Sequence, residues 1–143
     1  MRSKRLSQED GESYVLVFDV GDEVMNELKA FASQTGIDAS DFTAIGAFSS
    51  TVIGFFDIEA KDYRRIPIEE QVEVLTLVGN ISLDKGEPKV HAHVVLGLAD
   101  GTTRGGHLLE GNVRPTLELI LNESPGPLSR QFDPEIGLAL MRP

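Results

Sequence analysis

The chain has 143 residues, of which 41% are hydrophobic and 25% charged, and its formal net charge at pH 7 is −10. This length suffices for one domain with a core of its own, and the composition is ordinary for a soluble globular protein. The absence of cysteine excludes disulfide bonds and thiolate metal ligands, and the negative charge argues against tight binding to nucleic acid, which depends on Lys and Arg beside phosphates.

The N-terminal segment is basic but lacks the apolar stretch that a signal peptide would carry. No later run is long and apolar enough to span a membrane. We therefore expect a cytoplasmic protein that does not contact a membrane. Residues 1–12 are expected to form a flexible arm, and residues 13–143 a single domain.

The first regular element expected is a strand over residues 13–20, which is apolar on both faces and so suits the interior of a sheet. A helix should follow, with Asp22 as a candidate N-cap and Gly36 as a natural C-cap. Its apolar stripe indicates core packing and consists of Val24, Leu28, Phe31 and Ala32.

After the helix, the chain shows only strand signals. Strands are expected over residues 42–48, 51–58, 63–68, 72–83, 89–98, 102–110, 113–121 and 136–141. Ser49-Ser50 should break or bend the first pair, Gly79 is a candidate bulge, Gly111-Asn112 should form a turn, and residues 122–134 should form a long loop. One helix and about eight strands predict an α+β domain, a mainly antiparallel β-sheet with one principal α-helix.

All three histidines of the chain lie within residues 90–108. His91 and His93 are two residues apart, so on a strand their side chains point to the same face. Asp100-Gly101 is a hairpin signal, and His107 lies on the returning strand. The register of the hairpin therefore decides whether His107 joins the other two.

Two loops are compatible with this hairpin. A two-residue turn at Asp100-Gly101 would place His107 on the face opposite His93. A three-residue loop, Ala99-Asp100-Gly101, would combine a type I turn with a left-handed glycine and set His93 directly opposite His107. A bulge at Gly105-Gly106 would change the count by one. The sequence leaves these alternatives open.

In the three-residue register, His91, His93 and His107 share one face and offer three neutral imidazoles. Three protein ligands leave a fourth position open, which is the pattern of a catalytic rather than a structural zinc site. The alternative is three unrelated surface histidines. We take the three as candidate ligands of zinc or another divalent metal.

Other polar groups near this stretch are weaker candidates. Glu110 follows His107 by three residues, so alternation should turn it away from the histidines. Glu118 is expected to face solvent or to pair with Arg104 or Arg114. Arg104 could bind an anionic substrate, although in the three-residue register it points off the histidine face.

The order of elements and several short segments resemble the PPC domain, which is named for its presence in plants and prokaryotes. The matching segments are Gly46-Ala47-Phe48, Gly54-Phe55-Phe56-Asp57, Gly79-Asn80-Ile81-Ser82, Pro88-Lys89-Val90-His91-Ala92-His93, Asp100-Gly101 and Gly105-Gly106-His107-Leu108. The resemblance extends from about Tyr14 to Met141, and its most specific part is the histidine hairpin.

This resemblance implies an antiparallel sheet with one main helix, assembled as a homotrimer, and a metal at His91, His93 and His107. The PPC domain is also distantly similar in fold to acetolactate decarboxylase, a zinc enzyme with three histidine ligands. Plant members bind the DNA minor groove through an AT-hook that precedes the domain. In this chain, the basic residues 2–5 do not form such an Arg-Gly-Arg hook.

Two hypotheses for function follow. The first is zinc-dependent chemistry of a lyase or hydrolase type on a small anionic metabolite, through activated water or a polarised carbonyl. The alternative is a non-enzymatic DNA-binding or regulatory module. Because of the charge and the missing hook, we expect no tight duplex binding by this chain alone. An arginine or carboxylate that converges on the histidines would favour the first hypothesis.

Overall fold

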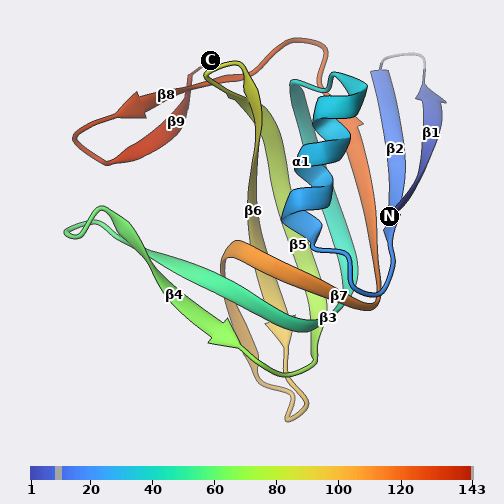
Figure 1. Ribbon diagram of the computed structural model, residues 1–143, viewed down its shortest axis with the longest axis vertical. Helices are drawn as coiled ribbons and strands as arrows, with labels where there is room; N and C mark the ends of the chain where they lie inside the picture. Colours follow the sequence, from blue (N-terminus) through green and yellow to red (C-terminus); the bar gives the residue numbers. More distant parts are fainter. Residues whose placement is uncertain (9–10, 143) are drawn as a thin grey trace.

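The structure, a computed structural model, describes residues 1–8 and 11–142, and this part of the chain contains nine strands and one α-helix. The strands are β1 (Arg2–Gln8), β2 (Gly11–Phe18), β3 (Ala39–Asp57), β4 (Asp62–Ile68), β5 (Val72–Asp84), β6 (Glu87–Gly97), β7 (Thr103–Glu123), β8 (Ser129–Asp133) and β9 (Leu138–Arg142), and the helix is α1 (Val24–Thr35) (Figure 1). The mainly antiparallel sheet with one helix that the sequence predicts is confirmed.

Four strands at the centre of the sheet pair in a closed circuit. β3 pairs with both β7 and β5, and β6 pairs with both β5 and β7. β2 and β1 extend the sheet beyond β7, β4 pairs with β3, and β8 and β9 continue from β5. Only the β5–β8 pair among these is parallel in the described residues. The two strands that carry the histidines, β6 and β7, therefore lie inside the sheet rather than at its edge.

The helix lies across one face of the sheet (Figure 1). Its expected apolar stripe is buried, and Gly36 ends it in a left-handed conformation with φ of 76°, as predicted. Ala92, Val94 and Leu96 of β6 are buried in the same core. Because side chains alternate along a strand, the odd-numbered residues of β6 point to the opposite face of the sheet.

The N-cap of α1 is Glu23 rather than Asp22. The Glu23 carboxylate accepts hydrogen bonds from the backbone N–H groups of Met25 and Asn26, and it also accepts one from Gly111 of β7 at 2.9 Å. This third hydrogen bond ties the start of the helix to the sheet. The tie is a long-range contact, so local capping preferences could not indicate it.

Residues 2–8 form strand β1, which corrects the expectation of a flexible arm over residues 1–12. β1 pairs with β2 along its length, from Arg2 opposite Val17 to Gln8 opposite Gly11, and Arg2 also forms an ion pair of 2.9 Å with Asp19. The backbone hydrogen bonds that order this segment come from β2, because the segment's own composition is polar. Residues 9 and 10 of the expected arm lie outside the described residues.

Ser49-Ser50, expected to break or bend the chain, lies at a bend within one long strand, and the turn expected at Gly111-Asn112 is wrong. β3 continues through Ser49-Ser50 and β7 continues through Gly111-Asn112, and the register of their pairing shifts on both sides of Phe48. A bulge of this kind bends a strand without ending it. The expected loop over residues 122–134 contains strand β8.

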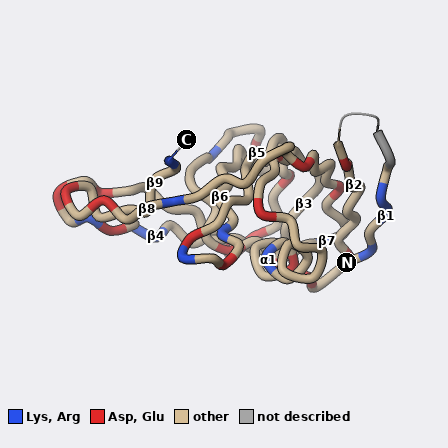
Figure 2. The backbone as a smooth tube through the Cα atoms, turned by 90° about the horizontal axis from the view of Figure 1, so that it is seen from above, with Lys and Arg blue, Asp and Glu red and all other residues tan. Residues whose placement is uncertain are grey.

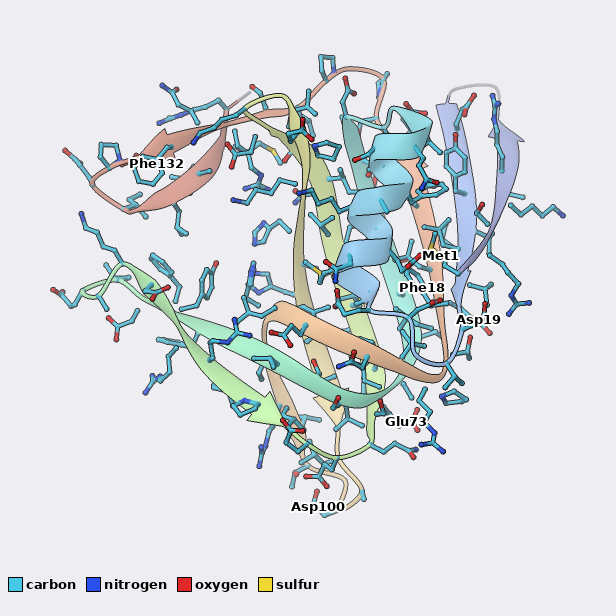
Figure 3. The ribbon with its side chains drawn as sticks, viewed as in Figure 1. Met1, Phe18, Asp19, Glu73, Asp100 and Phe132 are labelled. Carbon is cyan, nitrogen blue, oxygen red and sulfur yellow. The ribbon has the colours of Figure 1, made fainter. Side chains whose placement is uncertain are left out.

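Two hairpins project from the same side of the molecule. One consists of the outer part of β3 with β4, and the other of β8 with β9 (Figure 1). Their ends are linked by a hydrogen bond of 2.9 Å from Lys61 Nζ to the carbonyl oxygen of Pro134. Phe132 lies on the second hairpin (Figure 3).

No helix in the described residues is long and apolar enough to cross a bilayer.

Candidate metal centre

The loop between β6 and β7 is the three-residue form. Leu98 donates its N–H to the carbonyl of Thr102, and Gly101 donates to the carbonyl of Leu98, each at 2.9 Å. Gly101 has φ of 82°, the left-handed conformation that this loop requires. Asp100 lies at the end of the hairpin (Figure 3) and accepts hydrogen bonds from the N–H and hydroxyl of Thr102. Of the two registers that the sequence leaves open, this loop selects the one that places His107 opposite His93.

The three histidines lie together on one face of the sheet. His93 pairs directly with His107 across β6 and β7, and the Nε2 atoms of His91 and His93 are 3.2 Å apart. One nitrogen from each of the three rings lies within 4.8 Å of the others. His93 is exposed, whereas His91 and His107 are partly buried, so the cluster opens toward solvent on one side.

The donor atoms suit a divalent metal ion. Two nitrogens that ligate one tetrahedral zinc ion at about 2.0–2.1 Å lie roughly 3.3 Å from each other. The separation of 3.2 Å between the Nε2 atoms of His91 and His93 is close to this value. Imidazole nitrogen is a preferred ligand of zinc and its neighbours in the first transition series. His91 and His93 therefore fit such an ion without rearrangement of β6, and a nitrogen of His107 lies within 4.8 Å of theirs.

The environment keeps two of the imidazoles uncharged. Burial, followed by the positive charge of Arg130, lowers the pKa of His91. Burial, followed by the neighbouring His91 and His93, lowers the pKa of His107 to about 4. Both side chains are consequently neutral at pH 7, which is the state that metal ligation requires.

Gly79 of β5 allows the backbone of β6 to pack closely against β5 at the histidines. The residue pairs with Ala92, between the two histidines of β6, and a Cβ atom at position 79 would collide with the carbonyl oxygen of His91 and with the ring of Phe42. The register of β5 against β6 is regular here, and the shift lies earlier, between Val74 and Thr76. The expectation of a bulge at Gly79 is therefore wrong, and close packing explains the glycine.

Tyr63 of β4 packs against His107. The two rings stack with centroids 4.6 Å apart and planes at 28°, and the tyrosine oxygen lies 3.5 Å from His107 Nδ1. Burial raises the pKa of Tyr63, so its hydroxyl is protonated at neutral pH. Gly54 makes room for the ring, because a Cβ atom there would lie 2.8 Å from Tyr63 Cδ1. With Nδ1 of His107 facing the tyrosine, Nε2 is the nitrogen left for a metal.

Arg130 of β8 approaches the cluster from the other hairpin. One of its terminal nitrogens, Nη2, lies 3.5 Å from Nδ1 of His91 and donates to the Asn80 side-chain oxygen at 2.8 Å. Its Nε donates to the hydroxyl of Ser82 at 2.7 Å. Four elements thus meet at the cluster: β6 and β7 carry the histidines, and β4 and β8 bring Tyr63 and Arg130.

The sequence missed both of these residues. Tyr63 lies in a strand that was expected, but the pairing of β4 with β3 that brings it over His107 has no local signal. Arg130 lies in a segment that was expected to be a loop. β8 contains a single apolar residue, Phe132, so alternation could not indicate it, and its parallel pairing with β5 is a long-range contact.

The other polar candidates lie outside the cluster. Glu110 is exposed and forms an ion pair with Arg65, as a surface carboxylate does. Arg104 and Glu118 are exposed on their strands. Gly106 pairs regularly with Val94, so the residues before His107 contain no bulge.

Comparison with known proteins points to one family. A family model described as the Plants and Prokaryotes Conserved (PCC) domain matches residues 5–125. The chain is 33% identical over 120 residues to the bifunctional protein GlmU of Synechococcus sp. (strain JA-3-3Ab), a match that covers 82% of this chain and 18% of that protein. A second Synechococcus GlmU is 32% identical over 127 residues, with 19% of its length covered. The chain therefore spans about a fifth of the length of these curated relatives.

Solved structures resemble the chain over nearly its whole length. A plant- and prokaryote-conserved (PPC) protein of Pyrococcus horikoshii is 34% identical with a TM-score of 0.87, covering 99% of this chain and 95% of that one. A metal-containing protein of Archaeoglobus fulgidus is 35% identical with a TM-score of 0.87, covering 98% and 99%. A candidate DNA-binding protein of Bacteroides thetaiotaomicron is 26% identical with a TM-score of 0.90, covering 98% and 96%.

A more distant likeness is one of fold alone. The α-acetolactate decarboxylase of Bacillus subtilis is 12% identical with a TM-score of 0.59, and the match covers 88% of this chain and 58% of that one. This agrees with the distant similarity of fold that the sequence analysis expects, and it carries no residue-level argument about activity.

Proposed function

The chain belongs to the family of the Plants and Prokaryotes Conserved (PCC) domain, and we propose that in it His91, His93 and His107 bind a divalent metal ion, zinc in the first place. The observation that carries the proposal is the convergence of three imidazole nitrogens at a spacing that suits one ion. The description of the Archaeoglobus fulgidus relative as metal-containing supports it. Family membership also confirms the resemblance inferred from the sequence.

The proposed site has a catalytic rather than a structural character. Three protein ligands would leave a position for water or a substrate, and a bound ion there would polarise a carbonyl or activate water. Tyr63 holds His107 by stacking, and Arg130 contributes positive charge beside His91. These features favour metal-assisted chemistry on a small anionic molecule.

Elemental analysis of untagged protein tests the metal proposal. We expect close to one zinc per chain after purification with zinc, and loss of the metal in His91→Ala, His93→Ala and His107→Ala. Removal of a metal ligand should weaken binding more than the ten- to hundredfold typical of residues behind the ligands. Arg104→Gln is the matched control, because this exposed residue lies on the same hairpin and off the histidine face.

Circular dichroism before and after chelation completes this test. The fold should persist without metal, because a chain of this length buries a core of its own. If the wild type takes up no zinc when supplied with it, the metal proposal is wrong. If His107→Ala keeps its zinc, then the third ligand is wrongly assigned.

DNA binding, which the description of the Bacteroides relative suggests, is the weaker candidate for this chain. Figure 2 shows Lys and Arg in short, separate segments interspersed with Asp and Glu. A net charge of −10 opposes affinity for a polyanion. Titration of a labelled AT-rich duplex at about 150 mM salt, where the screening length is near 8 Å, should show no submicromolar binding. Sequence-specific binding below that concentration would favour the DNA-binding function instead.

We also propose that the chain assembles as a homotrimer through the sheet face opposite α1. The family resemblance implies this assembly, and the face carries exposed apolar side chains that a monomer would leave in water. Thr43 pairs with Val78 on one side and with Ile120 on the other, and these apolar residues are 47% and 52% exposed. Val78 also pairs with His93, so the apolar face is continuous with the proposed metal site.

A further inference from the structure

Arg130 is held in a fixed position beside the histidine cluster. Its guanidinium donates to the Ser82 hydroxyl at 2.7 Å, to the Asn80 amide oxygen at 2.8 Å and to the carbonyl oxygen of Ala139 at 3.1 Å. These contacts leave Nη2 at 3.5 Å from Nδ1 of His91. Three hydrogen bonds therefore fix the orientation of the planar guanidinium toward the cluster, so the side chain is not free to sample other rotamers.

All the hydrogen-bond acceptors that hold Arg130 are neutral. Among the described residues, it forms no ion pair with a carboxylate. Asp84, its pairing partner on β5, acts on Arg130 through its negative charge without forming an ion pair with it, and its carboxylate lies 3.3 Å from Lys89. A partly buried guanidinium without an anionic partner in direct contact is costly, because its lost hydration is only partly replaced by dipoles. The site therefore carries a positive charge that a ligand could neutralise.

His91 adds a second donor at the same place. If its Nε2, which lies 3.2 Å from Nε2 of His93, is a metal ligand, then its Nδ1 must carry the proton. Nδ1–H of His91 and Nη2–H of Arg130 would then be two donors 3.5 Å apart without an acceptor between them. Nδ1–H of a metal-bound histidine normally finds a carboxylate, a carbonyl or water. An oxygen of an anionic ligand would satisfy both donors.

We propose that Arg130 and the Nδ1–H of His91 form a subsite that binds the carboxylate of a small organic acid next to the metal position. This inference rests on the proposed function, because the metal fixes which His91 nitrogen carries the proton. It names the substrate class of the site, small carboxylates, and it assigns their recognition to Arg130 rather than to Arg104. Lys89, two residues before His91 on the same strand face, is paired with Asp84, so Arg130 remains the cation directed at the cluster.

The test is the binding of lactate to the wild type, with and without zinc, measured by calorimetry and by saturation-transfer NMR. Lactamide has the same shape without the charge, and inorganic phosphate is an anion of a different geometry. Arg130→Gln removes the charge, and Arg104→Gln is the matched control on the exposed face. Asn80→Asp is the second variant: it keeps the oxygen that accepts from Arg130 and adds a carboxylate that should compete with the ligand.

We expect zinc-loaded wild type and Arg104→Gln to bind lactate in preference to lactamide and phosphate. Arg130→Gln and Asn80→Asp should each weaken lactate binding about ten- to hundredfold, the range for charged hydrogen bonds, while zinc content stays unchanged. Asn80→Asp retains the hydrogen bond to Arg130, so it keeps the test valid if Arg130→Gln loosens the β8–β9 hairpin.

The outcomes separate the two proposals. If zinc binds but lactate does not, or if both variants bind lactate as the wild type does, the carboxylate subsite is wrong and the metal site stands. Phosphate bound more tightly than lactate would also overturn the assignment to carboxylates. If lactate binds through Arg130 without any uptake of zinc, Arg130 still recognises carboxylates, but the metal proposal and the donor role of His91 Nδ1–H are both wrong. If neither zinc nor lactate binds, both are wrong.

Discussion

His93 and His107 face each other across the β6–β7 pair, and His107 pairs on its other side with Gly54 of β3. The register that brings the third histidine to the first two is therefore held by two partners. The three-residue loop sets it from one end, and the long pairing of β7 with β3 sets it along the rest of the strand. A substitution that weakens the loop should consequently lower the free energy of unfolding while the three histidines keep their arrangement in the folded protein.

Gly101→Ala tests this division. The left-handed φ of 82° at this position disfavours a side chain, so we expect unfolding to require about 1–2 kcal/mol less. Metal content should not change, because β3 still holds the register of β7. Gly101→Asn should be milder, since asparagine tolerates this conformation better. Urea denaturation and elemental analysis measure the two effects, and loss of metal in folded Gly101→Ala would mean that the loop alone sets the register.

Gly79→Ala should destabilise the protein by a different mechanism. A methyl group there has no space between the His91 carbonyl and the ring of Phe42, and overpacking of this kind costs about 1–3 kcal/mol. Because the strain acts on β6 between its two histidines, metal affinity should also fall. Gly126→Ala is the control, since a methyl group at that position meets nothing within 4 Å. Equal stability of the two variants would show that β6 can shift without cost.

The stability of the metal-free protein should fall on acidification in a way that depends on His107. The pKa of this residue is 6.5 in a model peptide and about 4 in the folded protein. Between these values the unfolded chain binds a proton that the folded chain does not, so stability is lost as pH drops from 6.5 to 4. Thermal unfolding from pH 7 to 4 should show a shallower loss in His107→Gln. An identical pH dependence in both proteins would exclude this origin.

The same lowered pKa values extend the range of metal binding. A histidine with the ordinary pKa of about 6.5 loses a metal to protons below roughly pH 6. Because the pKa values of His91 and His107 are lowered, protons compete less at these two ligands. We expect zinc occupancy to persist somewhat below pH 6, as measured by elemental analysis after equilibrium dialysis at stepped pH. Complete loss already at pH 6.5 would contradict this expectation.

The homotrimer is tested by light scattering. The untagged wild type should have about three times the chain mass of 15.6 kDa. Ile120→Lys places a charge in the apolar sheet face and should reduce the mass toward that of one chain. Val20→Lys is the matched control, because Val20 is 67% exposed and lies between β2 and α1. A monomeric wild type at micromolar concentration would remove the proposal.

The parts of the fold that could be predicted are those with a local signal. Alternation in β6, the stripe of α1 and the two candidate loops at Asp100-Gly101 all follow from neighbouring residues, but the sequence does not decide between the loops. That residues 2–8 form a strand could not be predicted, since the hydrogen-bond partners of β1 belong to β2. Tyr63 and Arg130 were missed for the same reason. Their approach to the histidines depends on pairings of β4 with β3 and of β8 with β5.

The closed circuit of β3, β5, β6 and β7 divides the site into parts of unequal rigidity. His93 and His107 each lie between two paired strands, so their amide hydrogens should exchange only when the centre of the sheet opens. Tyr63 belongs to β4, which in the described part of the chain pairs only with β3, so its amide hydrogen should exchange sooner, whereas Arg130 pairs with both Asp84 and Met141. The histidines and Arg130 would then keep their arrangement while β4 moves Tyr63, so that the space beside His107 can change without loss of the ligand geometry.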